Sequence, residues 1–396
     1  MLEELKDKKI VILGYGREGK DTLLFLKKLF PKKKIGLADQ KFGKDYLKKL
    51  KNYDIIIKSP GITFKILPRP VLEKITTQTE IFFNNCPGQI IGVTGTKGKS
   101  TTASLIYKIL KTAGLKVHLV GNIGKPVLNL LFSATPKDIY VYELSSFQLT
   151  NLKKSPHIAV LLNIYQEHLD YYRNFKEYVD AKDNIARWQT KVDYLIFNSD
   201  NKFVRQIAKK SVAKKIPIIG DYYDLDKNAA RSVGKIFGIT QGIIEKAIKN
   251  FEPLPHRLEL VGTFRGITFY DDAIATIPEA TIGALNKLGD KVETIFLGGH
   301  DRGINFKNLA KRMSRSKIKN IILFPASGQR IWKELKNKNS FNHFFVDNMQ
   351  KAVKLAYRHT NKGKIVLLSC ASPSFGLFKD YEEKGNLFKK YVKQLR

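Results

Sequence analysis

Short apolar runs alternate along the whole chain with longer stretches in which apolar residues recur at helical spacing. A run such as residues 9–13 (KIVIL) is typical of a strand that is buried on both faces of a parallel sheet. Strands that alternate with helices in this way predict an α/β protein. The same pattern predicts further strands at residues 35–38, 53–57, 89–93, 116–120, 139–143, 157–163, 194–197, 266–270, 294–297, 320–324 and 364–368.

The length of 396 residues is enough for two or three domains. The segment Pro253, Leu254 and Pro255 has the composition of a linker. We therefore predict three α/β units, over residues 1–87, 88–254 and 255–396.

Lys and Arg number 70 against 36 acidic residues, a formal net charge of +34. Such an excess is found in nucleic-acid-binding proteins, but it is also the signature of a chain that places Lys on every solvent face. The basic residues are spread along the whole sequence, and no nucleic-acid-reading motif accompanies them. We therefore predict no nucleic-acid partner, and a surface suited to attracting an anionic substrate.

Two features bear on the cellular compartment. Cys86 and Cys370 have neither disulfide-framework nor metal-ligand spacing, so we expect two buried thiols in a reducing compartment. The N-terminus is charged where a signal peptide needs an apolar core, and no apolar run approaches the roughly 18 residues of a membrane span. The prediction is a cytoplasmic protein.

The sharpest motif is the segment 94–101 (TGTKGKST), between a predicted strand and a predicted helix. Glycines let backbone N–H groups approach phosphate oxygens, and the helix N-terminus adds a favourable dipole. Lys99 is placed to reach the β- and γ-phosphates, and the Ser100 hydroxyl to bind Mg²⁺. The segment therefore predicts a nucleoside triphosphate site made by Thr94, Gly95, Thr96, Lys97, Gly98, Lys99, Ser100 and Thr101.

A second glycine-rich turn follows the first strand. Gly14, Gly16 and Gly19 satisfy the GxGxxG spacing, and Asp39 follows about 20 residues later. The turn is consistent with a bound dinucleotide, with the diphosphate of a sugar nucleotide, or with a purely structural tight turn.

Three further side chains are candidates by their place in the predicted sheets. Glu143 ends a strand and His168 follows another, at the edge where ligands bind in parallel α/β sheets. A carboxylate there can hold Mg²⁺, whereas a lone histidine is more often structural. Lys182 has the sequence context of a surface lysine.

The motifs, taken in order, resemble the Mur ligase family, and most closely its glutamate-adding members. The resemblance is strong from about residue 88 to the end and weaker before it. It rests on TGTKGKST (94–101), GNIGKP (121–126), ELSSFQL (143–149), EHLDYY (167–172), YVDAK (178–182), LPHRLE (254–259), FYDDAIATIPEAT (269–281), LGGHDRG (297–303) and LLSCASPSFGLFKDYEEKG (367–385).

The resemblance implies a Rossmann-like N-terminal domain for a UDP-linked precursor, a central P-loop ATPase-type domain and a Rossmann-like C-terminal domain that closes over the nucleotide. It implies an ATP-dependent ligase, expected to be a monomer. This enzyme would activate UDP-N-acetylmuramoyl-L-alanine as an acyl phosphate and join it to glutamate in peptidoglycan synthesis.

Residue roles follow from the same resemblance. Lys99, His168, Lys182 and Asn122 would be catalytic. Two Mg²⁺ sites would be made by Ser100, Glu143, His168 and a carbamylated Lys182. The precursor would be bound by Gly14, Gly16, Asp39, Ser59, Gly61 and Asn122. ATP would also be contacted by His256, Arg257 and Asp272, and glutamate by Thr276, Arg302, Ser374 and Tyr381.

The chain departs from the D-glutamate-adding pattern at its predicted glutamate site. Ile274 stands where those enzymes usually have lysine, Arg302 stands for another lysine, and Pro373 precedes Ser374 in place of alanine. D-glutamate is the prediction by family default, and an L-glutamate-adding variant is the alternative. The segment between Lys182 and His256 is short, and residues 223–228 (YDLDKN) replace the family's HNxxN pattern, which leaves the nucleotide-base contact open.

Other functions remain as alternatives. One is another amide ligase of the superfamily, such as a folylpolyglutamate synthetase or a different Mur enzyme. A folylpolyglutamate synthetase would lack the N-terminal UDP-binding unit. A basic P-loop ATPase acting on nucleic acid would leave the C-terminal motifs unexplained. A non-catalytic homologue conflicts with the retention of Lys99, Glu143, His168 and Lys182.

Overall fold

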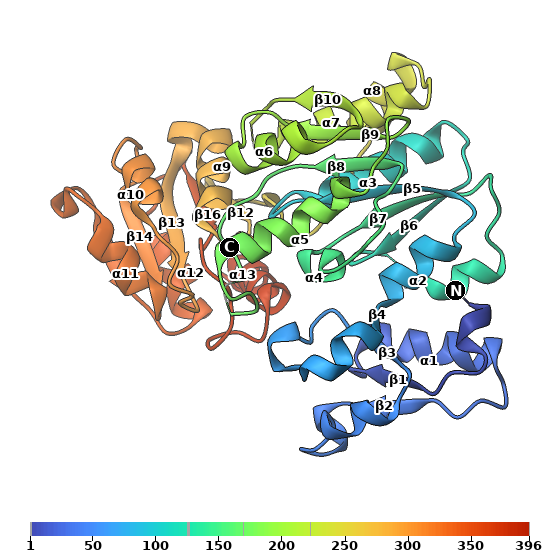
Figure 1. Ribbon diagram of the computed structural model, residues 1–396. Helices are drawn as coiled ribbons and strands as arrows, with labels where there is room; N and C mark the ends of the chain where they lie inside the picture. The colour runs from blue at the N-terminus through green and yellow to red at the C-terminus, as the bar shows by residue number, and fades with distance from the viewer. Residues whose placement is uncertain (1, 125–126, 169, 222, 396) are drawn as a thin grey trace. The chain divides into compact units, whose positions relative to one another are not determined.

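The computed structural model describes residues 2–124, 127–168, 170–221 and 223–395. The chain forms two compact units, Met1–Phe251 and Glu252–Arg396 (Figure 1). Three sheets lie in the described residues, two in the first unit and one in the second. The predicted α/β class is confirmed, while the predicted boundary at residue 87 stays a prediction.

The first sheet is parallel, with the strand order β2-β1-β3-β4. All four residues of β1 are buried, so this strand forms the centre of the first core. The strands are β1 (Ile10–Leu13), β2 (Gly36–Ala38), β3 (Ile55–Lys58) and β4 (Ile75–Thr76), and the helices are α1 (Arg17–Leu29) and α2 (Gln78–Asn85).

The second sheet is parallel, in the order β10-β9-β8-β5-β7-β6. Its strands are β5 (Gln89–Thr94), β6 (Val117–Gly121), β7 (Ile139–Glu143), β8 (Ile158–Leu161), β9 (Tyr194–Asn198) and β10 (Lys214–Ile218). Its helices are α3 (Lys99–Thr112), α4 (Ser146–Leu149), α5 (Phe175–Arg187), α6 (Lys202–Lys210), α7 (Asp224–Ile236) and α8 (Gln241–Lys249).

Both faces of this second sheet are buried, which explains its continuous apolar runs. Successive residues of a strand point to opposite faces. Ile90 and Tyr142 therefore pack into one cluster, whereas Ile91 and Val141 pack into another that includes α3 and α7. Because β5 pairs with both β7 and β8, the carboxyl ends of these three strands meet beside the loop that follows β5.

The third sheet has the order β11-β12-β16-β13-β14-β15, with β11 antiparallel at one edge and the other pairs parallel. Its strands are β11 (Glu259–Phe264), β12 (Ile267–Asp271), β13 (Val292–Gly298), β14 (Asn320–Phe324), β15 (Asn342–Phe345) and β16 (Ile365–Leu368). Its helices are α9 (Pro278–Leu288), α10 (Lys307–Met313), α11 (Ser327–Glu334), α12 (Met349–His359) and α13 (Tyr381–Gln394).

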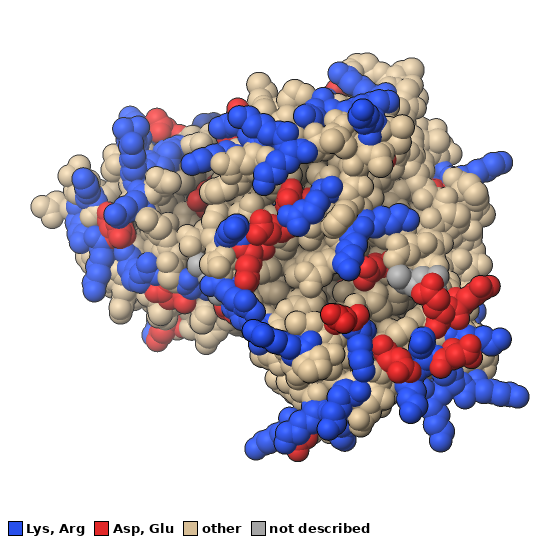
Figure 2. Space-filling model, viewed as in Figure 1, with Lys and Arg blue, Asp and Glu red and all other residues tan. Residues whose placement is uncertain are grey.

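The excess of basic residues is spread over the surface. Figure 2 shows Lys and Arg side chains distributed across the face in view, with no single patch that gathers them. This distribution matches the prediction of a generally basic surface.

Two sequence predictions can be compared with the described residues directly. None of their helices is both long and apolar enough to cross a membrane. Cys370 is buried as expected, but Cys86 is only partly buried, because it follows the last turn of α2. The expectation of two buried thiols was therefore wrong for Cys86.

Candidate functional site

The loop after β5 is held in place from two sides. The Thr96 N–H donates to the Asn163 carbonyl at 2.7 Å, and the Lys97 N–H donates to Asn163 Oδ1 at 2.8 Å. Gly98 has φ of +87°, and a Cβ there would lie 2.4 Å from Asp226 Oδ1. Only glycine fits this turn without strain.

The predicted triphosphate-binding side chains surround this loop. Lys99 begins α3, and its ammonium donates to the carbonyls of Gly95 at 3.1 Å and Thr96 at 3.0 Å. Ser100 and Thr101 are half-buried in the first turn of α3, so a ligand can reach them. The Lys99 side chain therefore lies against the loop that is predicted to bind the triphosphate.

Glu143 lies at the end of β7 and has one oxygen without a partner. Its Oε1 accepts a hydrogen bond from Asn122 Nδ2 at 3.1 Å. Its Oε2 is buried and has no hydrogen-bond partner among the described residues. A buried anionic oxygen is costly unless it is compensated, so this atom fits a cation.

Lys182 is buried in α5, not at the surface as its sequence context suggests. The residue is 1% exposed, and its amine donates to the Gly95 carbonyl at 2.8 Å and to Thr94 Oγ1 at 3.2 Å. Burial, with the nearby Lys99 cation, lowers the pKa of Lys182 well below its usual value. The neutral amine is the form that can react with carbon dioxide to give a carbamate.

His168 and Glu167 lie together on the loop after β8. The His168 Nε2 is 3.6 Å from Glu167 Oε2, and its ring packs edge-on against Phe147 at 4.7 Å. Glu167 Oε1 pairs with Lys97 Nζ at 2.9 Å. Burial raises the pKa of Glu167, but Lys97, His168 and Lys99 outweigh it and bring the pKa to about 2. A permanently ionised carboxylate therefore stands beside His168.

A cavity of about 740 Å³ lies in the first unit beside this edge of the sheet. All six predicted precursor-binding residues line it: Gly14, Gly16, Asp39, Ser59, Gly61 and Asn122. The motif GNIGKP contributes Gly121 and Asn122 to the lining, while its Lys125 and Pro126 lie outside the described residues.

The cavity wall is shaped by the glycine-rich turn after β1. Gly14 has φ of +93°, and its carbonyl accepts a hydrogen bond from Ser59 Oγ at 2.7 Å. The Asp39 carboxylate accepts from the Tyr15 N–H at 2.7 Å and the Lys41 N–H at 3.0 Å. These backbone hydrogen bonds lower the pKa of Asp39, so it is an ionised group that fixes the turns it joins.

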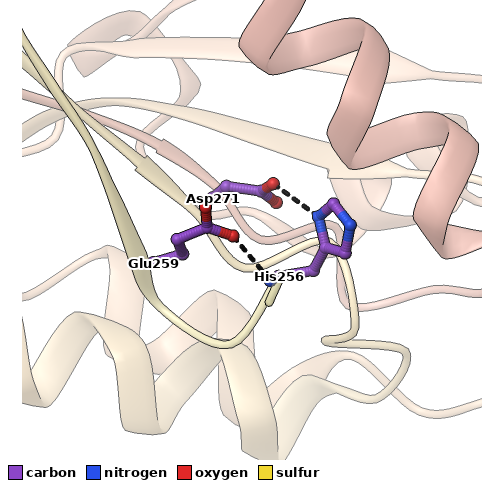
Figure 3. Close-up of side chains that lie close together, drawn as sticks. All are labelled: His256, Glu259 and Asp271. Carbon is purple, nitrogen blue, oxygen red and sulfur yellow. Dashed lines mark hydrogen bonds and ion pairs between the residues drawn. The ribbon is translucent and has the colours of Figure 1, made fainter. Parts of the chain in front are cut away.

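In the second unit, His256 is part of a buried network (Figure 3). Its Nδ1 lies 2.7 Å from Asp271 Oδ2, and its backbone N–H donates to Glu259 Oε2 at 2.8 Å. One potential ligand atom from each of His256, Glu259 and Asp271 lies within 4.8 Å of the others, as a metal site would require. Lys389 Nζ, however, lies 3.1 and 3.0 Å from the two Glu259 oxygens. This ammonium already supplies the positive charge, so we interpret the group as a hydrogen-bonded network and not as a metal site.

Asp272 and Arg257, two predicted ATP contacts, lie next to this network. The buried Asp272 carboxyl accepts from Ser369 Oγ at 2.8 Å and from the Leu258 N–H at 3.2 Å. Burial raises the pKa of Asp272 to about 7, although Ser369 and Arg257 oppose the shift. The Arg257 Nε is buried without a hydrogen-bond partner among the described residues, so its N–H is a donor that a ligand atom could satisfy.

The four predicted glutamate-binding residues all belong to the second unit. Ser374 is buried, with its hydroxyl unpartnered among the described residues, and Tyr381 packs edge-on against His256 at 6.0 Å. Thr276 and Arg302 are partly exposed on loops after β12 and β13. The predicted phosphate-loop residues belong to the first unit.

Sequence reasoning missed several residues of these groups. Asp226 accepts a hydrogen bond from Thr102 Oγ1 at 2.9 Å behind the phosphate loop. Arg330 pairs with Asp301 and donates to the Ile304 carbonyl at 3.0 Å, which anchors the loop that carries Arg302. Glu167 was missed as well. It is the one of these three residues that the sequence could have indicated, because it directly precedes the predicted ligand His168.

Two family models match adjoining parts of the chain. Residues 93–264 match the Mur ligase middle domain, and residues 256–372 match the Mur ligase glutamate ligase domain. The chain is 33% identical to a UDP-N-acetylmuramoylalanine–D-glutamate ligase of Acetivibrio thermocellus, over 99% of the chain and 98% of that protein. It is 32% identical to the protein of the same name from Clostridium acetobutylicum, over 99% and 98%.

Solved structures share the fold. MurF ligase from Thermotoga maritima in complex with ADP aligns with a TM-score of 0.63 at 16% identity, covering 100% of the chain and 98% of that structure. A pseudomurein peptide ligase type C from Methanothermus fervidus aligns with a TM-score of 0.64 at 17% identity, covering 98% and 100%.

Proposed function

Because the chain belongs to the Mur ligase family of ATP-dependent, amide-bond-forming ligases, we propose that it joins glutamate to UDP-N-acetylmuramoyl-L-alanine in peptidoglycan synthesis. The observation that carries the proposal is the position of Asn122. Its side chain donates a hydrogen bond to Glu143 beside the phosphate loop. Asn122 also lines the cavity, together with every other predicted precursor-binding residue. A precursor in that cavity would thus be next to a triphosphate on the loop.

The proposed reaction has two steps. The alanine carboxylate of the precursor attacks the γ-phosphorus of ATP, the bond from that phosphorus to the ADP oxygen breaks, and an acyl phosphate forms. The amine of glutamate then attacks the acyl carbon, the bond from that carbon to the phosphate oxygen breaks, and the amine loses a proton. In this proposal Lys99 leaves the loop carbonyls to contact the triphosphate, and Asn122 orients the carboxylate.

The donor set of the first unit fits two Mg²⁺ ions. Ser100 and Glu143, with its unpartnered oxygen, would hold one ion, and His168 with a carbamate on Lys182 would hold the other. A protonated lysine cannot bind a cation, whereas a carbamate offers the anionic oxygens that Mg²⁺ prefers. Bound Mg²⁺ would offset the charge repulsion between the carboxylate and the triphosphate.

In the second unit we assign His256, Arg257 and Asp272 to ATP. We assign Thr276, Arg302, Ser374 and Tyr381 to glutamate. Arg302 can form a bidentate pair with a carboxylate, which a lysine cannot. The relatives quoted above are named for D-glutamate, which supports that isomer, while Ile274 and Arg302 keep the L-isomer as the alternative.

The proposed substrates also define the setting of the enzyme. ATP and nucleotide-linked precursors are intracellular metabolites, so we propose a cytoplasmic enzyme that acts as a monomer. Its product would feed cell-wall synthesis and therefore growth and division.

The direct test is an assay of the purified chain with ATP, Mg²⁺, UDP-N-acetylmuramoyl-L-alanine and each glutamate enantiomer separately. We expect ADP release only when precursor and one enantiomer are both present. The product mass should equal precursor plus glutamate minus water. Absence of turnover with both enantiomers contradicts the proposal, and ADP release stimulated by DNA or RNA without precursor would favour the nucleic-acid ATPase instead.

A further inference from the structure

An acidic residue stands in the wall of the precursor cavity, where an anionic ligand is proposed to bind. Glu18 is the second residue of α1, and it lines the cavity together with Gly16 and Arg17. A helix N-terminus attracts anions, and a carboxylate in its first turn competes with any anionic ligand for that site. The chain therefore places a negative charge where the precursor's diphosphate is expected.

The Glu18 carboxyl is held in this position. Its Oε1 accepts a hydrogen bond from Gln148 Nε2 at 2.8 Å. The Oε1 of Gln148 in turn accepts from the Ser145 N–H at 3.0 Å and the Ser145 hydroxyl at 3.1 Å. The capping box of α4 thus holds the Gln148 side chain in the orientation that hydrogen-bonds Glu18.

The charged and titratable groups around Glu18 come from one helix, α1, and two strands, β3 and β7. Arg17 and Asp21 lie on α1, Lys58 ends β3, and Tyr142 lies on β7. Burial raises the pKa of Glu18 to about 7, while Gln148, Lys58 and Arg17 act in the opposite direction. Burial also keeps Tyr142 neutral by raising its pKa, and Gln78 of α2 contributes only an uncharged amide to the Glu18 carbonyl.

Lys58 is a buried cation that does not line the cavity itself, so it acts on an anion there only through space. Its ammonium donates to the carbonyls of Ser59 at 3.1 Å and Ile62 at 2.8 Å. Among the described residues it forms no ion pair with Glu18 closer than 4.0 Å, so the two interact only through space. Burial lowers the pKa of Lys58 to about 8, which leaves it mostly charged at neutral pH.

We propose that Glu18 makes precursor binding proton-linked: the diphosphate replaces the Glu18 charge as the counter-ion of Lys58 and Arg17, and Glu18 takes up one proton from solvent. The proposal rests on the proposed function, because it needs a diphosphate in this cavity. A diphosphate diester keeps its charge constant around neutral pH, so the proton goes to Glu18. The protonated carboxyl can then donate to a phosphate oxygen while its other oxygen still accepts from Gln148.

The sign of the pH dependence follows from linkage. A ligand that binds the protonated form preferentially has its full affinity below the pKa of the free group, which is about 7 here. Above that pH the affinity falls, by about tenfold for each pH unit while one proton is taken up. The residue therefore restricts tight binding of the precursor to neutral and mildly acidic conditions.

The test measures proton uptake by isothermal titration of UDP-N-acetylmuramoyl-L-alanine into the full chain, in buffers of different ionisation enthalpy. At pH 7 the wild type should take up about half a proton, and its Kd should rise roughly tenfold from pH 7 to pH 8.5. Glu18→Gln, which keeps the hydrogen bond from Gln148, should take up fewer protons than the wild type, because only Lys58 still titrates in this range. Its Kd should therefore rise less than the wild-type Kd from pH 7 to pH 8.5.

Asp21→Asn is the matched control. Burial also raises the pKa of Asp21, but this residue lies one turn further along α1 and does not line the cavity. This variant should keep the wild-type proton uptake. Zero uptake by the wild type, unchanged uptake in Glu18→Gln, or lost uptake in Asp21→Asn would each overturn the inference. Failure of the wild type to bind the precursor at any pH would instead count against the proposed function.

Discussion

Lys182 shows how much a side chain's role depends on contacts that the sequence does not reveal. Its context, YVDAK, has the charge pattern of an exposed helix face, yet the amine lies against the phosphate loop with 1% of the residue exposed. Lys99, Glu143 and His168 could be selected because each follows a strand or loop at a predictable sheet edge. Lys182 was named only through the family resemblance and Asp226 was not named, because both reach this edge from helices far along the chain.

Replacement of Lys182 by methionine should separate activity from stability. We expect glutamate-dependent ADP release to fall by roughly 100-fold or more, because a metal-supporting group is lost. The melting temperature should fall only slightly, since methionine keeps the apolar stem packed and loses only the hydrogen bonds of the amine to the Gly95 carbonyl and Thr94 Oγ1. Lys176→Met, an exposed change on the same helix, should affect neither quantity. Near-normal activity of Lys182→Met would contradict the role assigned to this residue.

Among the strands, sequence reasoning found all those inside the sheets and two edge strands, β2 and β6. The four that it missed, β4, β10, β11 and β15, all lie at sheet edges. An edge strand is covered less completely and needs no continuous apolar run, as the Lys-rich sequence of β10 and the mostly exposed β15 illustrate. The order of strands within each sheet likewise depends on long-range pairing, which local pattern does not encode.

The hydrogen bond between α3 and α7 should control the shape of the phosphate loop. Thr102→Val removes the donor to Asp226, a buried bond whose loss costs about 1–3 kcal/mol. We expect a lower melting temperature and a several-fold higher KM for ATP, with the KM for glutamate unchanged. Thr112→Val, which removes an exposed hydroxyl from the same helix, is the control. An unchanged KM for ATP would show that α7 does not fix the loop.

The loop between β13 and α10 depends on α11 in a similar way. Arg330→Met removes the pair with Asp301 and the bond to the Ile304 carbonyl. The pair is partly exposed, so we expect a loss of only about 1 kcal/mol, or roughly fivefold in KM for glutamate. The KM for ATP should not change, and Lys333→Met on the same helix should change neither KM. A selective increase in the KM for ATP would contradict the assignment of this loop to glutamate.

At the scale of the whole molecule, the net charge of +34 is large and widely distributed. The proposed substrates, ATP, a nucleotide-linked precursor and glutamate, are all anions, which a basic surface attracts over distances set by the Debye length. We expect kcat/KM for the precursor to fall several-fold between about 50 and 500 mM monovalent salt at constant free Mg²⁺. Because steering acts on encounter, kcat at saturation should change little. A flat salt dependence of kcat/KM would show that the charge has no part in substrate capture.

The proposed function depends on activation of the precursor's carboxylate as an acyl phosphate. Transfer of ¹⁸O tests it most directly, with both oxygens of the alanine carboxylate of UDP-N-acetylmuramoyl-L-alanine labelled. Attack of one of these oxygens on the γ-phosphorus predicts that each phosphate released with the product carries one ¹⁸O and that the new amide keeps the other. Unlabelled phosphate accompanied by glutamate ligation would contradict the account.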